Sequence, residues 1–177
     1  MLRPQTKHAV QPASDICRLS AVELAGAIRE RELSVREVVA AFLDRIEAVN
    51  PLVNAIVSLR DRADILREAD AADASLSRAE AAGPLFGMPI AIKDLASTTG
   101  LRTSFGSPIF ADFVPQEDDF FVERIRNAGA IIIGKTNVPE FGLGSNTYNA
   151  VFGPTLNAFD PALTAGGSSG GAAVALA

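Results

Sequence analysis

The sequence has very little histidine and cysteine, and this scarcity excludes several kinds of chemistry. Its one cysteine, Cys17, cannot form a disulfide within the chain and offers no pair of thiolates for a metal. Its one histidine, His8, lies in a polar, proline-containing leader. We therefore expect no Ser-His-Asp triad within this chain, and neither a metal nor an organic cofactor is indicated. The low cysteine content fits a cytoplasmic location.

Long apolar runs and clustered positive charge are also missing. No stretch approaches the length of a membrane span, and the first residues contain no apolar core typical of a signal peptide. The net charge is −5, and the lysines and arginines are scattered rather than gathered in a stripe. We therefore expect neither membrane insertion nor direct nucleic-acid binding. The 177 residues, 48% of them apolar, suffice for one globular domain with a core.

The hydrophobic pattern predicts an α/β fold. Serine followed three residues later by glutamate, a capping-box pattern, marks the start of two helices. Apolar, β-branched runs predict buried strands, and strand, helix, strand predicts a parallel unit. The expected elements are helices at 21–32, 35–50 and 61–82, the last a solvated scaffold helix, a strand at 88–92, a helix at 118–128, a strand at 130–133, a long site-lining loop at 141–160 and an apolar helix from 172.

The most informative segment is the run Gly-Gly-Ser-Ser-Gly-Gly at residues 166–171. Taken alone, it also fits a flexible serine-glycine linker. Here it leads directly into an apolar, alanine-rich stretch, which favours a helix start over a linker. Glycine permits close approach of backbone or substrate, so the run is typical of a backbone built around a reactive serine.

Lys93 ends a short apolar run, and two interpretations of it stay open. A lysine at a strand end commonly reaches solvent or pairs with a carboxylate such as Asp94. Burial, in contrast, disfavours the charged form of an amine and can make a lysine a general base. In the absence of a histidine in the body of the chain, Lys93 is the best candidate proton acceptor.

Residues 129–136 match G-x-x-x-x-G-K-[ST], the pattern of a phosphate-binding loop with Lys135 and Thr136 as ligands. Three consecutive isoleucines favour an extended strand instead of the curled loop that would cradle a phosphate. Pro139 also follows too soon for a long helix. A nucleotide-binding module is therefore the less favoured function, and residues 134–137 are expected to end a strand and begin a turn.

Four blocks taken together resemble the amidase signature family. They are Leu-Phe-Gly-Met-Pro-Ile-Ala-Ile-Lys-Asp at 85–94, Thr-Ser-Phe-Gly-Ser at 103–107, Ala-Gly-Ala-Ile-Ile-Ile-Gly-Lys-Thr-Asn at 128–137 with Glu140 and Phe141, and the glycine-serine run at 166–171. The resemblance extends from about residue 20 to the end of the sequence. It implies an α/β/α sandwich around a mixed sheet, and hydrolysis or transfer at a carboxamide C–N bond by a Ser-Ser-Lys triad.

The resemblance also assigns roles to residues. Lys93 would be the base, and Ser168, in a cis peptide, would relay protons between Lys93 and the nucleophile. Loop 142–146 would approach the substrate carbonyl. Residues implied to bind substrate or shape the site are Gly142, Gly144, Ser145, Gly166, Gly167, Ser169 and Gly170.

The nucleophilic serine of the family lies about two dozen residues beyond the paired serines, whereas this sequence ends eight residues after Ser169. We therefore expect a leader at 1–17 and, at 18–177, the amino-terminal part of a single amidase domain, inactive alone and with an incomplete sheet. The expected partner is a small-molecule amide. Three questions stay open: whether the protein is a hydrolase or part of an amidotransferase, whether it is a monomer or a homodimer, and whether it is a degenerate, non-catalytic interaction protein.

Overall fold

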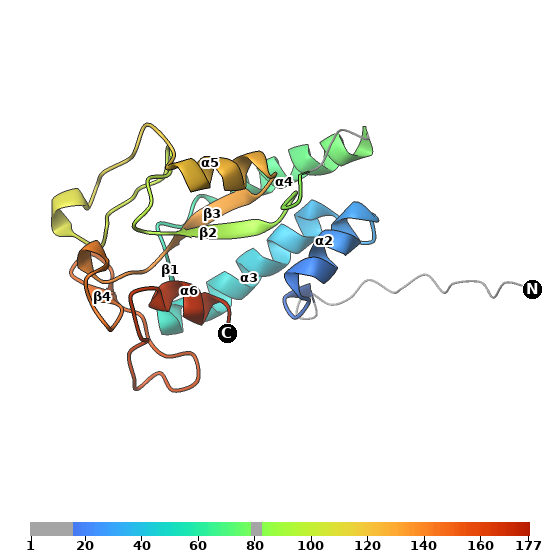
Figure 1. The fold of residues 1–177 in the computed structure, drawn as a ribbon. Coiled ribbons are helices and arrows are strands. Elements are labelled where there is room, and N and C mark those ends of the chain that lie inside the picture. Colours follow the sequence, from blue (N-terminus) through green and yellow to red (C-terminus); the bar gives the residue numbers. More distant parts are fainter. Residues whose placement is uncertain (1–15, 79–82) are drawn as a thin grey trace, which may run out of the picture.

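A computed structural model describes residues 16–78 and 83–177 as a mixed α/β domain (Figure 1). His8 and most of the expected leader lie outside these residues. Ile16 is buried in the main core, so it belongs to the packed domain. The elements are α2 (Ala21–Arg29), α3 (Val35–Val53), β1 (Ile56–Val57), α4 (Arg62–Ser77), β2 (Pro89–Lys93), η1 (Pro108–Phe110), α5 (Phe120–Asn127), β3 (Ile131–Thr136), η2 (Glu140–Gly142), β4 (Tyr148–Asn149), β5 (Gly153–Pro154) and α6 (Gly170–Ala175).

The two predicted capping boxes are present at the starts of α2 and α3, where Ser20 and Ser34 cap the helices. The ends of both helices differ from the prediction. Helix α2 stops three residues early because Arg31 adopts a left-handed conformation. Helix α3 continues through Pro51, and ends at a left-handed Asn54 whose N–H donates to the carbonyl of Asn50. A proline in the last turn removes only one donor, so the helix tolerates it.

The central sheet has the strand order β1-β3-β2 and is mixed. Strand β2 pairs parallel with β3, which confirms the predicted parallel unit, and β1 pairs antiparallel with β3. An irregularity at Ile90/Ala91 shifts the register, so that Ile92 lies opposite Lys135 and Lys93 opposite Thr136. The carboxyl ends of β2 and β3 therefore lie together, the usual place for a site in a parallel sheet.

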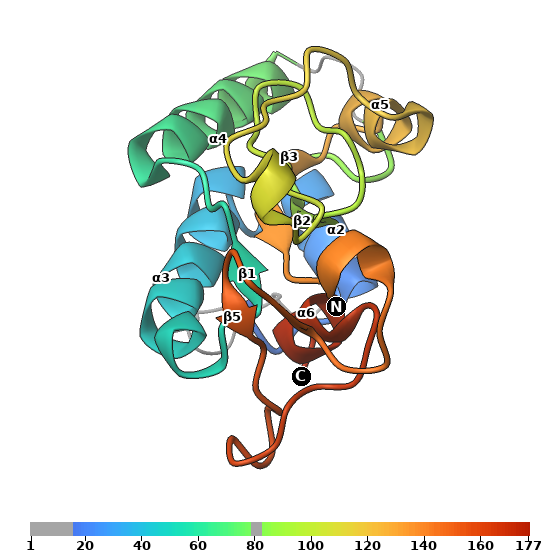
Figure 2. The same cartoon turned by 90° about the vertical axis from the view of Figure 1, so that its left-hand side faces the viewer.

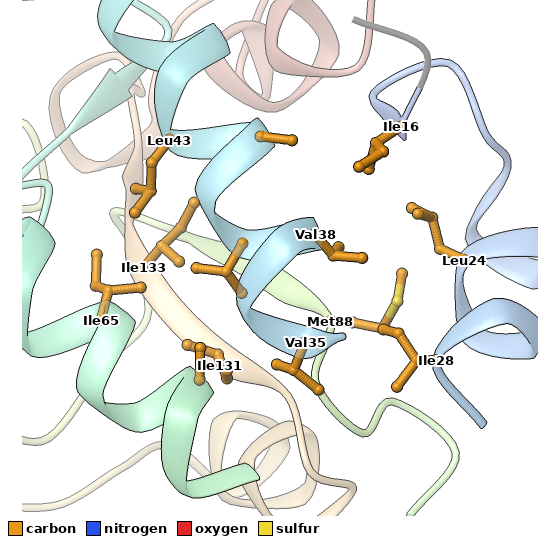
Figure 3. Packing of buried hydrophobic residues seen from close by; sticks show 13 residues of the cluster. Ile16, Leu24, Ile28, Val35, Val38, Leu43, Ile65, Met88, Ile131 and Ile133 are labelled. Carbon is orange, nitrogen blue, oxygen red and sulfur yellow. The ribbon is translucent and has the colours of Figure 1, made fainter. Parts of the chain in front are cut away.

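Helices cover both faces of the sheet, as an α/β/α arrangement requires (Figure 1). Helices α2, α3 and α4 share one core cluster with Met88, Ile131 and Ile133 (Figure 3). Helix α5 covers the other face, where Val122 packs with Ile92 and Ile132.

One prediction about an individual element is wrong. Helix α4 is not merely a solvated scaffold, because Ile65 and Ala69 on it are fully buried. The expectation that residues 134–137 end a strand is confirmed, because β3 ends at Thr136, with all six of its residues buried. The predicted loop at 141–160 is largely correct, although it contains the short β4–β5 hairpin. None of the helices in the described ranges is long and apolar enough to span a bilayer.

Two glycines give opposite predictions for stability. A Cβ on Gly171 would lie 2.3 Å from the nitrogen and 2.6 Å from the oxygen of Asn137, both backbone atoms. We expect Gly171→Ala to lower the free energy of unfolding by about 3 kcal/mol or more. Gly26 in α2 has open space at its Cβ position, so Gly26→Ala should raise that free energy by up to about 1 kcal/mol. Denaturant unfolding measures both, and equal effects would contradict this packing.

Candidate active site

Lys93 is the last residue of β2, and its side chain reaches the glycine-serine run across a separation of 75 residues. Its Nζ donates to Ser168 Oγ at 3.0 Å and to Ser169 Oγ at 2.8 Å. Lys93 and Ser168 are half-buried and Ser169 is exposed. The Lys93 amine therefore bonds to two hydroxyls. It does not pair with Asp94, which was one of the two interpretations left open by the sequence.

The glycine-serine run is not a linker, because it leads directly into helix α6 as the sequence context predicts. The peptide bond between Gly167 and Ser168 is cis, as the resemblance implies. Gly170 and Gly171 are buried at the helix start, where α6 packs against the three strands of the sheet. The N–H of Gly171 donates to the carbonyl of Asn137, just past β3. These contacts fix the two serines at the carboxyl ends of β2 and β3.

The loop at 142–147 also contacts the glycine-serine run at 166–171. The N–H of Gly167 donates to the carbonyl of Ser145, and a Cβ on Gly167 would lie 2.8 Å from the carbonyl oxygen of Gly144. The buried Thr147 hydroxyl donates to Gly166 O at 2.9 Å and accepts from the Gly170 N–H at 3.0 Å. One side chain thus bonds to the backbone on both sides of the paired serines.

Of the remaining predicted site residues, Gly142 lies furthest along the loop from the serines. It has a φ of +73°, and a Cβ there would lie 2.6 Å from Leu95 Cδ1. It thus contacts the turn that follows Lys93. The structure brings Lys93, Ser168 and Ser169 into direct contact, and it brings the backbone of 144–145 beside them.

Two buried charges lie behind the site, on the face of the sheet that α5 covers. Asp94 and Lys135 have no exposed surface. The carboxylate of Asp94 accepts from the N–H and the hydroxyl of Ser104, the latter at 2.6 Å. Lys135 Nζ donates to Ala96 O at 2.5 Å and to Thr98 Oγ1 at 2.9 Å.

Burial governs the ionisation of both groups. It lowers the pKa of Lys135 to about 8, although the negative charge of Asp94 acts in the opposite direction. It raises the pKa of Asp94, and the Ser104 hydrogen bond and the positive charge of Lys135 oppose that rise. Lys135 lies in a fully buried strand and binds protein groups, so the phosphate-loop interpretation of 129–136 is wrong.

One residue that sequence reasoning did not assign to the site is Thr136. It lies opposite Lys93 in the β2–β3 register. Its Oγ1 is buried and has no hydrogen-bond partner within the described part of the chain. In the sequence it belongs to the phosphate-loop pattern, which points to another chemistry, and to the amidase block at 128–137, for which no role of this residue was predicted. Its place beside the lysine depends on strand pairing.

Comparison with known proteins defines the class to which this fold and site belong. The family model described as Amidase matches residues 37–177, which is most of the chain. The chain therefore belongs to the amidase family. Its likeness to solved structures of amidase signature enzymes agrees with this.

The particular relatives fall into two groups. A glutamyl-tRNA(Gln) amidotransferase subunit of Acidothermus cellulolyticus is 48% identical over 93% of this chain and 32% of its own length, and the corresponding subunit of Streptomyces coelicolor is 43% identical over 93% and 33%. Among solved structures, a bacterial aryl acylamidase of the amidase signature family is 32% identical with a TM-score of 0.82, covering 88% of this chain and 32% of that one. Fatty acid amide hydrolase is 28% identical with a TM-score of 0.83, covering 92% and 29%. The chain thus spans about a third of the length of these relatives.

The Thr147 hydroxyl gives a prediction about the support of the paired serines. Thr147→Val keeps the shape but leaves the buried Gly170 N–H without its acceptor. We expect it to lower the free energy of unfolding by about 1–3 kcal/mol. Thr147→Ser keeps the hydroxyl and should cost less. Thermal or denaturant unfolding of the two variants tests this, and a valine variant as stable as wild type would show that the bond contributes nothing.

Proposed function

We propose that the protein to which this chain belongs is an amidase that cleaves carboxamide C–N bonds with a Ser-Ser-Lys triad, of which this chain supplies the base, Lys93, and the bridging residue, Ser168. The observation that carries the proposal is the hydrogen bond of 3.0 Å between Lys93 Nζ and Ser168 Oγ. A hydroxyl both donates and accepts, so Ser168 can pass a proton from a nucleophile to a neutral lysine.

In the proposed reaction, a serine hydroxyl from the part of the protein beyond Ala177 attacks the amide carbonyl. Its proton moves to Ser168 Oγ while Ser168 gives its own proton to the neutral Lys93 amine. When the tetrahedral intermediate collapses, the C–N bond breaks and the proton returns through Ser168 to the leaving amine. Water or another acceptor then releases the acyl group from the nucleophile, with the same residues moving its proton.

The other site residues would act through shape. The glycines of the run, Gly166, Gly167 and Gly170, allow its backbone to lie against the loop at 144–147. We assign Ser169, which also bonds to Lys93, to orienting the amine. We assign Gly142, Gly144 and Ser145 to the wall that meets the substrate carbonyl, because the loop they form adjoins the paired serines.

We also propose that residues 18–177 are the amino-terminal part of one larger amidase domain. Strand β2 has no second neighbour within the described ranges, so one sheet edge is open. A largely apolar groove of about 460 Å³ lies between α3, α6 and the face of the sheet. In Figure 1 α3 and α6 both lie below β2 and β3, and in the view of Figure 2 β1 appears between them. The relatives are about three times longer, which supports assigning this groove and edge to contacts with further polypeptide.

The triad proposal predicts the behaviour of three variants of the complete protein. Lys93→Ala and Ser168→Ala should each lower amide hydrolysis by about 10⁴-fold or more, since removing one member disables the unit. The control Arg67→Ala, which alters only an exposed ion pair on α4, should keep wild-type activity. Hydrolysis rates and labelling by a fluorophosphonate measure these effects.

The same assay should detect no turnover by the 177-residue chain alone. Turnover by that chain would contradict the placement of the nucleophile. Full activity of Lys93→Ala would contradict the triad. Absence of labelling and turnover in the complete wild-type protein would favour a degenerate, non-catalytic amidase domain.

The second candidate is the glutamine-hydrolysing component of a tRNA-dependent amidotransferase. The 48% identity to a glutamyl-tRNA(Gln) amidotransferase subunit supports it. This function requires protein partners, whereas a free-standing amidase acts alone. For the amidotransferase we expect ammonia release from glutamine that rises when partner subunits are added. Hydrolysis of aryl or aliphatic amides with no response to those subunits would support the free-standing enzyme.

A further inference from the structure

Lys135 and Asp94 are buried charged residues that the proposed reaction does not use. Both lie next to Lys93. Asp94 follows Lys93 in the chain, and Lys135 precedes Thr136, the residue on β3 that lies opposite Lys93. Neither can contact the lysine amine directly. Side chains alternate between the faces of a strand, so Lys93 points to the face of α6 while Ile92 and Asp94 point to the face of α5.

Lys135 binds the turn that continues from Lys93. Its Nζ bonds to the carbonyl of Ala96 and to the hydroxyl of Thr98, which itself donates to Ala96 O at 3.2 Å. The N–H of Ala96 in turn donates to the carbonyl of Lys93 at 3.0 Å. Two hydrogen bonds through Ala96 therefore lead from the ammonium on β3 to the backbone of the proposed base, and the Thr98 hydroxyl adds a second path of three bonds.

Asp94 attaches the same strand end to a second loop. Its carboxylate holds the N–H and hydroxyl of Ser104, and the Ser104 hydroxyl also accepts from the N–H of Gly106 at 3.0 Å. The backbone N–H of Asp94 donates to the carbonyl of Thr136 on β3 at 3.1 Å. The side chains of Asp94, Ser104 and Thr136 are all fully or almost fully buried. A buried ion is costly unless its bonds are satisfied, and stability alone rarely requires one.

We infer that Lys135, through Thr98 and the turn after β2, is a positioning residue that holds the Lys93 amine on the paired serines, with Asp94 fixing the same strand end from the loop at 104–106. This inference rests on the proposed function of Lys93. It gives the residues of the apparent phosphate-loop pattern a role in amide chemistry. A small displacement of a catalytic group by a distant change can cost about 100-fold in rate.

The test compares four variants of the complete protein: Lys135→Met, Thr98→Val, Thr98→Ser and Arg60→Met. Arg60 is the matched control, because it is a half-buried cation that also bonds to β3, at the carbonyl of Ile132, but it does not bond to the turn after Lys93. Two properties are measured: kcat and KM on an amide substrate, corrected for the folded fraction, and the rate at which trinitrobenzenesulfonate modifies the Lys93 amine, read by mass spectrometry.

We expect Lys135→Met and Thr98→Val to lower kcat by about 100-fold while KM changes little, because the base is misplaced and substrate binding is not altered. Both should also increase the modification rate of Lys93 several-fold, since the amine leaves its hydroxyl partners. Thr98→Ser keeps the hydroxyl and should rescue both properties. Arg60→Met should lower the melting temperature but leave kcat and the labelling rate of Lys93 unchanged.

Wild-type kcat and wild-type labelling of Lys93 in Lys135→Met and Thr98→Val would overturn the inference. If Lys135→Met does not fold, the Thr98 pair carries the test. The labelling measurement does not require turnover. Faster labelling of Lys93 in these variants of an otherwise inactive protein would therefore support the positioning role and reject the proposed function. Loss of activity in Lys93→Ala with no effect of Thr98→Val would support the proposed function and reject the positioning role.

Discussion

The parallel pairing of β2 with β3 is the constraint on which the rest of the structure depends. It places the end of β2, with Lys93, beside the end of β3, with Thr136. Just past β3, Asn137 bonds through its N–H to Ala55 and through its carbonyl to Gly171, so β1 and α6 join at the same point. Lys93 meets two serines that lie 75 and 76 residues further along the chain because the backbones that carry them share this junction.

The two faces of the sheet differ at the ends of β2 and β3: the face of α6 carries the paired serines, and the face of α5 carries the buried charged residues. On the side of α6, glycines let the backbones of the serine run and the loop at 144–147 touch, so the hydroxyls stand at a defined place without bulky neighbours. On the side of α5, Lys135 and Asp94 each bind buried polar partners in a low-dielectric interior. Buried polar groups are held rigidly when their hydrogen bonds are satisfied, and here Lys135 bonds to the turn after Lys93.

Local patterns predicted much of this arrangement. The two capping boxes, the parallel unit and the helix that starts at the glycine-serine run depend on residues close in sequence, and the structure has each of them. The burial of helix α4 was mispredicted. Ile65 lies in a polar-looking stretch, and only packing against distant segments buries it. Propensity is a weak guide where tertiary contacts decide burial.

The sequence by itself determined that a lysine would end an apolar strand, that two serines would open a helix, and which family these blocks resemble. It could not decide whether Lys93 pairs with Asp94 or with the serines, because both are compatible with a strand end. Tertiary structure decided it: alternation along β2 sends the two neighbouring side chains to opposite faces, and Ser104 takes the carboxylate while Ser168 and Ser169 take the amine. The register irregularity in the β2–β3 pairing places Lys135 opposite Ile92, on the buried face that α5 covers, where a motif alone would have placed a phosphate.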